Sequence, residues 1–286
     1  ISRYGLVSYS NSLDQIGPIS RTAADCALLF SCIAGNDPRD ATSIKMNSED
    51  YLTGIKDDAK GLKIGVVKEL FAKGTQESVE KINWKALDHL SDQKVIFSEI
   101  SIPELKFALP AYYVMAMAEA SSNLARYDGL KFGLPIKGWT GSWSKYISKC
   151  RGLGFGEETK RRIILGTYIL SAGYYEQYYL KALKVRTLIK NAFEEAFKKF
   201  DLLTGPSMPI IPPKIGENIE DPMKMYAADL DTVPANLSGL PSISVPAGFS
   251  DFLPVGVQFI APPLKENLLL RVAFSLESRG VKTIAK

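Results

Sequence analysis

The sequence is poor in the groups on which many hydrolases and metalloenzymes depend. Its 286 residues include one histidine, His89, so a Ser-His-Asp triad or a histidine-rich metal site has little to draw on. His89 also lies beside apolar positions at helical spacing, which favours a structural role. No Walker loop is present and no GxGxxG follows a strand-like run. The sequence therefore shows no nucleotide site of its own.

Cysteine is also scarce, and long apolar runs are missing. The three cysteines form no CxxC pair, and two of them fall in an apolar helical pattern, which predicts reduced core thiols in a cytoplasmic protein: Cys26, Cys32 and Cys150. The apolar runs are short or are broken by Gly, Pro and Lys, well below the roughly 20 residues of a membrane span. We therefore expect a soluble protein without membrane contact.

Strong charge of one sign is absent too. The formal net charge is +4, and Lys and Glu are mixed along the chain with only short basic clusters such as 160–162. Charge alone therefore does not indicate a nucleic-acid partner.

The chain begins at Ile1 without the basic, apolar and small-residue layout of a signal peptide. We interpret this start as an internal cut.

What is present is a globular composition, with 46% hydrophobic residues, and an alternation of helical and strand-like patterns. Capping-box spacing at Thr22 and Asp25 starts the first helix. Its apolar residues at i, i+3, i+4 and i+7 are expected to be buried: Cys26, Leu29, Phe30 and Ile33. We predict helices at 22–33, 77–90, 106–126, 174–200 and 265–278, and strands at 61–67, 94–100, 242–245 and 255–260. Strand, helix and strand at 61–100 indicate a parallel crossover. The stretch 129–154 keeps no period and is interpreted as an irregular excursion. We expect α/β layers around one sheet.

Several segments are more specific than these patterns. Residues 13–18, LDQIGP, and residues 244–246, SVP, resemble segments shared widely among amidases. Residues 119–129, EASSNLARYDG, and the stretch from KRR at 160 to KVRTLI at 184–189 resemble more narrowly the glutaminase subunits of tRNA-dependent amidotransferases. Within the first segment, Asp14 is interpreted as a turn acid. The matches run along the whole chain, which is thereby identified as a member of the amidase signature family.

The resemblance implies the amidase signature fold, an α/β fold with a mixed central sheet covered by helices. The family's Lys-Ser-Ser groups, in which a lysine and a bridging serine relay the proton of a nucleophilic serine, lie in an N-terminal strand and a Gly/Ser-rich signature. Neither motif can be read here. We therefore expect residues 1–286 to be the C-terminal portion of a single amidase domain, with the N-terminal part of the sheet missing. The Lys and both Ser are expected upstream of residue 1, so this chain is expected to hold no catalytic residue and to be inactive alone.

By the same resemblance, three residues are expected to bind glutamine. Arg162 would pair with the substrate carboxylate and Asp229 with its ammonium group, as suits a guanidinium and an acid. Tyr113 would add a hydroxyl contact. Without the resemblance these residues would be interpreted as solvated surface groups. Their nearest rivals in the sequence are the adjacent Arg161 and Tyr112.

The implied activity is hydrolysis of glutamine to glutamate and ammonia. The ammonia would pass to a partner that converts Glu-tRNA(Gln) to Gln-tRNA(Gln), or Asp-tRNA(Asn) to Asn-tRNA(Asn). ATP, Mg²⁺ and most tRNA contacts would belong to a partner B subunit, with a small C subunit bridging, and no cofactor or metal is expected in this chain. The expected location is the cytoplasm, or the mitochondrial or plastid matrix in a eukaryote.

Two alternatives to this activity stay open. One is a stand-alone amidase that acts on another acyl amide, for which the substrate pocket would be apolar. The other is a non-catalytic scaffold or binding fragment. The opposite charges of Arg162 and Asp229 favour glutamine, because an apolar amide would make poor use of them.

Overall fold

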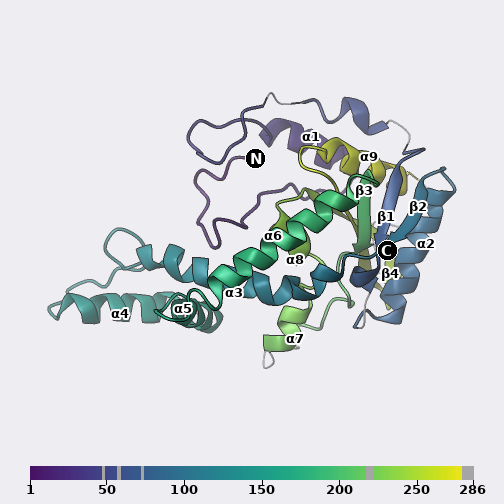
Figure 1. Ribbon diagram of the computed structural model, residues 1–286. Coiled ribbons are helices and arrows are strands. Elements are labelled where there is room, and N and C mark those ends of the chain that lie inside the picture. The colour runs from purple at the N-terminus through teal and green to yellow at the C-terminus, as the bar shows by residue number, and fades with distance from the viewer. Residues whose placement is uncertain (47–48, 57–58, 72–73, 217–221, 279–286) are drawn as a thin grey trace. The chain divides into compact units, whose positions relative to one another are not determined.

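Figure 1 shows the computed structural model, which describes residues 1–46, 49–56, 59–71, 74–216 and 222–278. The chain divides into two compact units. The first, here called the sheet unit, contains Ile1–Tyr4, Gln15–Leu109 and Arg186–Lys286, and the second, the helical unit, contains Gly5–Asp14 and Pro110–Val185. The expectation of a single amidase domain stays a prediction.

The sheet unit is built on a mixed β-sheet. Its described strands are β1 (Lys63–Val67), β2 (Ile96–Ile100), β3 (Leu202–Pro206), β4 (Ser242–Ser250) and β5 (Leu253–Ile260), in the order β2-β1-β3-β5-β4. β1 pairs in parallel with β2 and with β3. β5 pairs antiparallel with β3 and with β4. The mixed sheet expected from the sequence is thus confirmed.

The parallel crossover predicted at 61–100 is confirmed as β1, helix α2 (Glu77–Ser91) and β2. The apolar stripe of α2 is buried at Val79, Ala86 and Leu90, whereas His89 in its last turn is only partly buried. β2 begins two residues later than predicted. Lys94 has a positive φ of 64°, which belongs to a turn and not to an extended strand.

Helix α1 (Ala23–Ile33) starts as predicted but buries a different face. The Thr22 hydroxyl oxygen accepts a hydrogen bond from the Asp25 N–H at 3.1 Å. The predicted core stripe included Leu29 and Ile33, which are exposed by 42% and 38%. Small residues face helix α9 (Glu266–Glu277) instead, and the buried positions of α1 are Ala23 and Ala27. Cys32 is exposed, so the prediction of a core thiol is wrong there.

The core of the sheet unit lies between the sheet and helices α2 and α9, which contact β4 and each other. Alternate residues of β1 and β5 enter it, as expected for strands with one face on a core: Ile64, Val66, Val257 and Phe259. Gln258, also buried, donates from Nε2 to the carbonyl oxygens of Pro206 (2.9 Å) and Asp231 (2.6 Å). This side chain therefore satisfies two main-chain acceptors, one at the end of β3 and one in the turn that follows residue 229.

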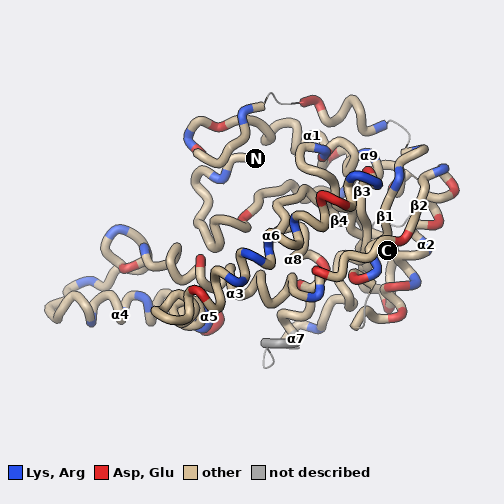
Figure 2. Tube along the Cα trace, in the orientation of Figure 1, with Lys and Arg blue, Asp and Glu red and all other residues tan. Residues whose placement is uncertain are grey.

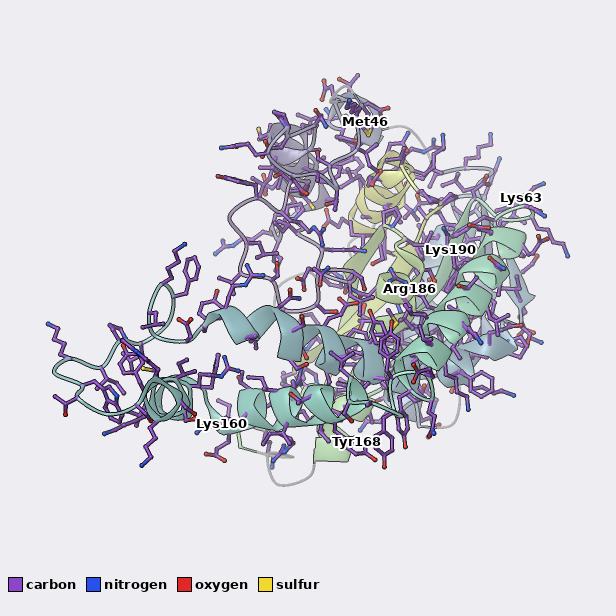
Figure 3. The ribbon with its side chains drawn as sticks, turned by 60° about the vertical axis from the view of Figure 1, so that its left-hand side comes forward. Met46, Lys63, Lys160, Tyr168, Arg186 and Lys190 are labelled. Carbon is purple, nitrogen blue, oxygen red and sulfur yellow. The ribbon has the colours of Figure 1, made fainter. Side chains whose placement is uncertain are left out.

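Shorter elements complete the sheet unit. They are η1 (Thr53–Lys56), η2 (Lys68–Phe71), η3 (Pro103–Phe107), α7 (Pro222–Ala227) and α8 (Val233–Ser238). The second half of helix α6 (Tyr179–Ala196) also belongs here and carries Arg186 and Lys190, which are labelled in Figure 3. Arg186 Nε donates to the Leu237 carbonyl oxygen at 2.7 Å and so ties α6 to α8.

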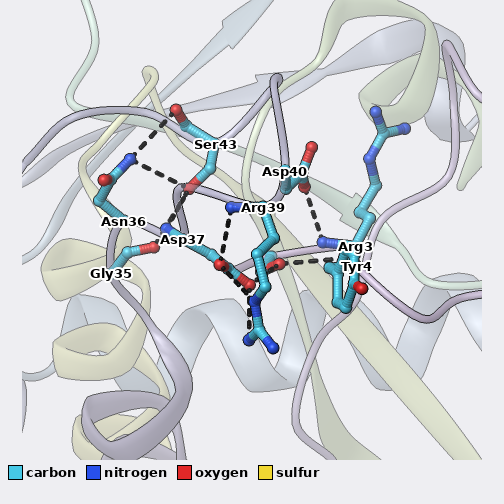
Figure 4. A network of polar contacts seen from close by, with 9 residues as sticks. Arg3, Tyr4, Gly35, Asn36, Asp37, Arg39, Asp40 and Ser43 are labelled. Carbon is cyan, nitrogen blue, oxygen red and sulfur yellow. Dashed lines mark hydrogen bonds and ion pairs between the residues drawn. The ribbon is translucent and has the colours of Figure 1, made fainter.

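The first residues of the chain are held on the turn at 35–43 (Figure 4). The Ser2 hydroxyl donates to Asp37 at 2.8 Å, and the Arg3 N–H donates to Asp40 at 2.8 Å. Arg39 also donates to Asp37 at 3.0 Å. Its hydrogen bonds lead the effects that lower the pKa of Asp37 to about 2.

Charges of both signs are interspersed along the described chain (Figure 2), in line with the mixed pattern of the sequence.

The helical unit contains most of α3 (Ala108–Asn123), η4 (Leu124–Arg126), α4 (Trp143–Gly154), α5 (Glu157–Ile169) and the start of α6. The excursion predicted at 129–154 is wrong in its second half, which forms α4. Only Tyr146 and Cys150 of α4 are buried, so its apolar period is too brief to stand out in the sequence.

None of the described helices combines the length and apolar character that a membrane crossing needs.

A close crossing of α5 and α3 and a tyrosine cluster mark the helical unit. A Cβ atom added to Gly166 on α5 would overlap the Met117 carbonyl oxygen on α3, so the two backbones meet where a side chain is absent. α6 begins at residue 179 and not at 174, because the preceding residues form turns with packed rings. Tyr168, at the end of α5 (Figure 3), lies 4.4 Å from Tyr174 between ring centroids, and their hydrogen bond raises the pKa of Tyr168 to about 12.

Candidate functional site

Helix α5 positions the arginine expected to bind a carboxylate. Its first turn holds Glu157 and Glu158, which suit the positive end of the helix dipole. Arg162 lies one turn after Glu158 on the same face, and its Nε donates to Glu158 at 2.8 Å. Arg161 donates to the other oxygen of Glu158 at 2.6 Å. One acidic side chain thus holds both arginines.

Burial separates the two arginines. The Arg162 side chain is 22% exposed, whereas that of Arg161 is 46% exposed. Arg162 Nη1 also donates to the Tyr9 hydroxyl at 2.8 Å. Burial works against the charge of Arg162, but the hydrogen bonds to Glu158 and Tyr9 outweigh it and raise the pKa of the guanidinium. Arg162 is therefore a fixed cation in a partly enclosed place, whereas Arg161 is largely a surface group.

Two tyrosine rings lie close to the Arg162 guanidinium, and one of them, Tyr113, belongs to helix α3. The guanidinium carbon lies 5.9 Å from the centroid of the Tyr113 ring and 5.6 Å from that of Tyr9. Tyr113 is 9% exposed, and the Tyr112 ring packs against it edge-on at 5.1 Å. Of the two adjacent tyrosines, Tyr113 is the one whose ring lies under the Arg162 guanidinium. A hydroxyl contact from Tyr113 to a substrate stays a prediction.

Asp229, the third expected site residue, belongs to the sheet unit. It follows α7 and precedes α8, where its carbonyl oxygen accepts from the N–H groups of Thr232 (3.2 Å) and Val233 (3.1 Å). Its side chain is partly exposed. The structure therefore places Arg162 and Tyr113 together in the helical unit, whereas Asp229 belongs to the sheet unit.

A second acid near Asp229 was missed by the sequence analysis. Asp231 is fully buried, and among the described residues neither of its carboxylate oxygens has a hydrogen-bond partner. Burial raises the pKa of this carboxyl to about 8. Because a small ligand has no path to a fully enclosed group, Asp229 remains the better candidate for contact with a substrate ammonium.

The sequence analysis also missed Tyr9 and Glu158, which hold Arg162, and Glu119, which lies on α3. Glu158 could have been found from its spacing of four residues before Arg162. Glu119 is an acid inside the apolar run of α3 and is 8% exposed, which is an unusual place for a charge. Tyr9 gave no local signal. Asp14 is confirmed as a turn acid, because its carboxylate accepts from the N–H groups of Tyr9 and Ser10, both at 3.1 Å.

Metal and thiol chemistry find little support in the part of the chain that the structure describes. No cluster of three or more His, Cys, Asp or Glu side chains there could hold a metal ion. The three cysteines are free thiols, and burial raises the pKa of the partly buried Cys26. A thiol with a raised pKa is a poor nucleophile at neutral pH.

The fold has counterparts among known proteins. Residues 1–270 match the Amidase family, so the chain belongs to the amidase family. A peptide amidase structure that is 22% identical has a TM-score of 0.74 over 100% of this chain and 58% of that one. At that identity the likeness concerns the fold, and it confirms the amidase fold expected from the sequence.

More similar proteins carry a more specific name. The chain is 51% identical to the A subunit of glutamyl-tRNA(Gln) amidotransferase from Caldanaerobacter subterraneus subsp. tengcongensis, over 97% of this chain and 57% of that protein. The protein of the same name from Methanosarcina mazei is also 51% identical, over 97% and 58%. The crystal structure of the corresponding protein from Thermotoga maritima is 40% identical with a TM-score of 0.78, over 97% and 55%. The chain thus spans a little more than half the length of these relatives.

Proposed function

We propose that the complete protein hydrolyses glutamine and supplies the ammonia for a tRNA-dependent amidotransferase. The observation that carries the proposal is the 51% identity to the A subunit of a glutamyl-tRNA(Gln) amidotransferase across 97% of the chain. The product would be Gln-tRNA(Gln) formed from Glu-tRNA(Gln), with Asn-tRNA(Asn) from Asp-tRNA(Asn) as a second product of the same chemistry.

The side chains that would recognise glutamine have suitable chemistry. A guanidinium binds a carboxylate through two parallel N–H bonds, and Arg162 is already held in one orientation by Glu158 and Tyr9. A partly exposed carboxylate such as Asp229 suits the substrate ammonium. Tyr113 would complete the site below Arg162. Two opposite charges favour a free amino acid over an apolar amide.

The remaining parts of the reaction would lie outside this chain. The nucleophilic serine of the Lys-Ser-Ser groups implied by the family resemblance would attack the carboxamide carbon of the bound glutamine, with its proton passing through the bridging serine to the lysine. ATP and Mg²⁺ would bind to a partner B subunit, which would also make most contacts with the misacylated tRNA, and a small C subunit would join the two. The complex would work in the cytoplasm or in an organelle matrix.

The test is ammonia release from glutamine by the complete protein with its partner subunits. Arg162→Ala and Asp229→Ala should each raise KM for glutamine at least about tenfold, because each removes a charged contact to the substrate. Arg161→Ala is the matched control, since it removes a neighbouring arginine that shares Glu158 but is more exposed. Assembly of the complex, followed by size-exclusion chromatography, should be unchanged in all three.

Three results would overturn the proposal. Unchanged glutamine kinetics in both Arg162→Ala and Asp229→Ala would make these residues surface groups. Faster turnover of an apolar amide such as hexanamide than of glutamine by the wild-type complex would favour a stand-alone amidase. A complex with no hydrolytic activity on either substrate would favour the scaffold.

A further inference from the structure

Helix α3 carries a buried carboxylate, Glu119, that the proposed chemistry does not use. Glu119 is 8% exposed. One of its oxygens accepts from the Ser10 hydroxyl (2.8 Å) and the Ser12 N–H (2.9 Å). The other accepts from the hydroxyls of Ser12 (2.5 Å) and Tyr179 (3.3 Å). Four donors on one buried acid make a directed anchor, because each bond fixes the donor's position relative to α3.

Three of these four donors come from one short segment, residues 9–14, here called the anchor loop. Asn123 lies one turn after Glu119 on α3, and therefore on the same face. Its Nδ2 donates to the Tyr9 carbonyl oxygen at 3.2 Å and to the Asn11 side-chain oxygen at 2.9 Å. Asp14 closes the loop from within by accepting from the N–H groups at its start. The anchor loop is therefore fastened to α3 along its length.

The start of the anchor loop is the residue that holds Arg162. The Tyr9 hydroxyl accepts the Arg162 Nη1 hydrogen bond at 2.8 Å, and the Tyr9 ring lies 5.6 Å from the guanidinium. Tyr113, on α3 itself, lies 5.9 Å from the same guanidinium. Helix α3 thus reaches Arg162 twice, directly through Tyr113 and indirectly through the anchor loop and Tyr9.

Resting on the proposed function, we propose that Glu119 is a positioning residue for carboxylate recognition. By fastening Ser10 and Ser12 it places the Tyr9 hydroxyl so that the Arg162 guanidinium is held in the plane that a substrate carboxylate needs. The physical reason is geometric: two parallel N–H bonds form only when guanidinium and carboxylate are coplanar. A guanidinium carries five N–H donors, so it can bond the oxygens of Glu158 and Tyr9 and both oxygens of a substrate carboxylate together. Tyr9 acts in the same chain of contacts as Glu119.

A purely structural role of Glu119 makes a different prediction. If the anchor loop only stabilised the fold, its loss would lower activity towards every substrate alike. If it positions Arg162, its loss is felt only by substrates that carry the α-carboxylate. Glutaminamide, in which that carboxylate is replaced by an amide, separates the two roles because its reacting carboxamide is the same.

The experiment measures side-chain deamidation of glutamine to glutamate and of glutaminamide to isoglutamine by the complete protein in its assembled complex, because ammonia alone would not tell which amide of glutaminamide reacted. Tyr9→Phe removes one oxygen and keeps the ring, Ser12→Ala removes one donor to Glu119, and Glu119→Gln keeps the shape of the anchor. Each should raise KM for glutamine about five- to tenfold, with kcat within about twofold and KM for glutaminamide unchanged. The control is Glu157→Gln, whose side chain is 96% exposed.

The outcomes distinguish this inference from the proposed function. If Arg162→Ala leaves the preference for glutamine over glutaminamide unchanged, the proposed function fails at that residue. If Arg162→Ala abolishes the preference while Tyr9→Phe and Glu119→Gln keep the wild-type KM, the positioning role is overturned and Arg162 still binds the carboxylate. Tyr9→Phe decides alone if Glu119→Gln does not assemble. In the Arg162→Ala background, Tyr9→Phe should add nothing, and a further rise in KM there would also overturn the positioning role.

Discussion

Asp231 gives a sharp test of how burial controls the stability of this chain. The residue is 0% exposed, and burial raises its pKa from 3.8 to about 8. The folded state therefore binds this proton more tightly than the unfolded state does. The carboxyl costs no stability below pH about 4 and costs progressively more as the pH rises towards 8. At about 1.4 kcal/mol for each pH unit between the two pKa values, the cost is limited to about 6 kcal/mol.

The perturbation is Asp231→Asn, which keeps the shape and removes the ionisation. The Gln258 hydrogen bond ends on the Asp231 carbonyl oxygen, so the substitution leaves it intact. Urea unfolding followed by tryptophan fluorescence should show that the variant gains stability relative to wild type by about 2 to 3 kcal/mol between pH 5 and pH 8. This lies below the limit because proteins relax around a buried charge.

The control for this experiment is Asp88→Asn, at an exposed position on α2. Its stability difference from wild type should change by less than about 0.5 kcal/mol over the same pH range. A difference between Asp231→Asn and wild type that is constant from pH 5 to pH 8 would refute the reasoning. It would mean that the Asp231 carboxyl titrates alike in the folded and unfolded states.

Three further predictions concern other parts of the structure. Thr22→Ala removes the acceptor for the Asp25 N–H at the start of α1 and should lower the free energy of unfolding by about 1 kcal/mol in urea, with Thr22→Ser close to wild type. Gln258→Leu leaves two buried carbonyl oxygens without their donor and should lower it by about 2 to 4 kcal/mol; an unchanged midpoint would contradict the assigned bonds. Tyr174→Phe removes the hydrogen bond that leads the effects raising the pKa of Tyr168, so spectrophotometric titration should show Tyr168 ionising at lower pH, and no change would contradict that cause.

The elements predicted correctly are those whose pattern is local. Helix α2 repeats its apolar residues over four turns, and the strands on either side are short β-branched runs, so the crossover could be read without tertiary information. Helix α1 shows the limit of such patterns. Two of its faces are apolar, and the close approach of α9 selects the one with small residues, Ala23 and Ala27. No local rule contains that choice.

The candidate site divides in the same way. Arg162 and Tyr113 were identified from segments that resemble a family, and the structure places them over one another. Tyr9 and Glu119 were not identified, because their contacts join positions more than a hundred residues apart: Glu119 to Ser10 spans 109 residues and Arg162 to Tyr9 spans 153. Hydrogen bonds over such distances depend on the packing of α3, α5 and the anchor loop, which no single segment encodes.

The crossing at Gly166 also constrains how this sequence can vary. A Cβ atom at that position would overlap the Met117 carbonyl oxygen, so any other residue must push α5 away from α3. Arg162 lies one turn earlier on α5, and its place over Tyr113 depends on that contact. Glycine at 166 and arginine at 162 should therefore be conserved together among related sequences. Sequences without the glycine should also more often lack the arginine.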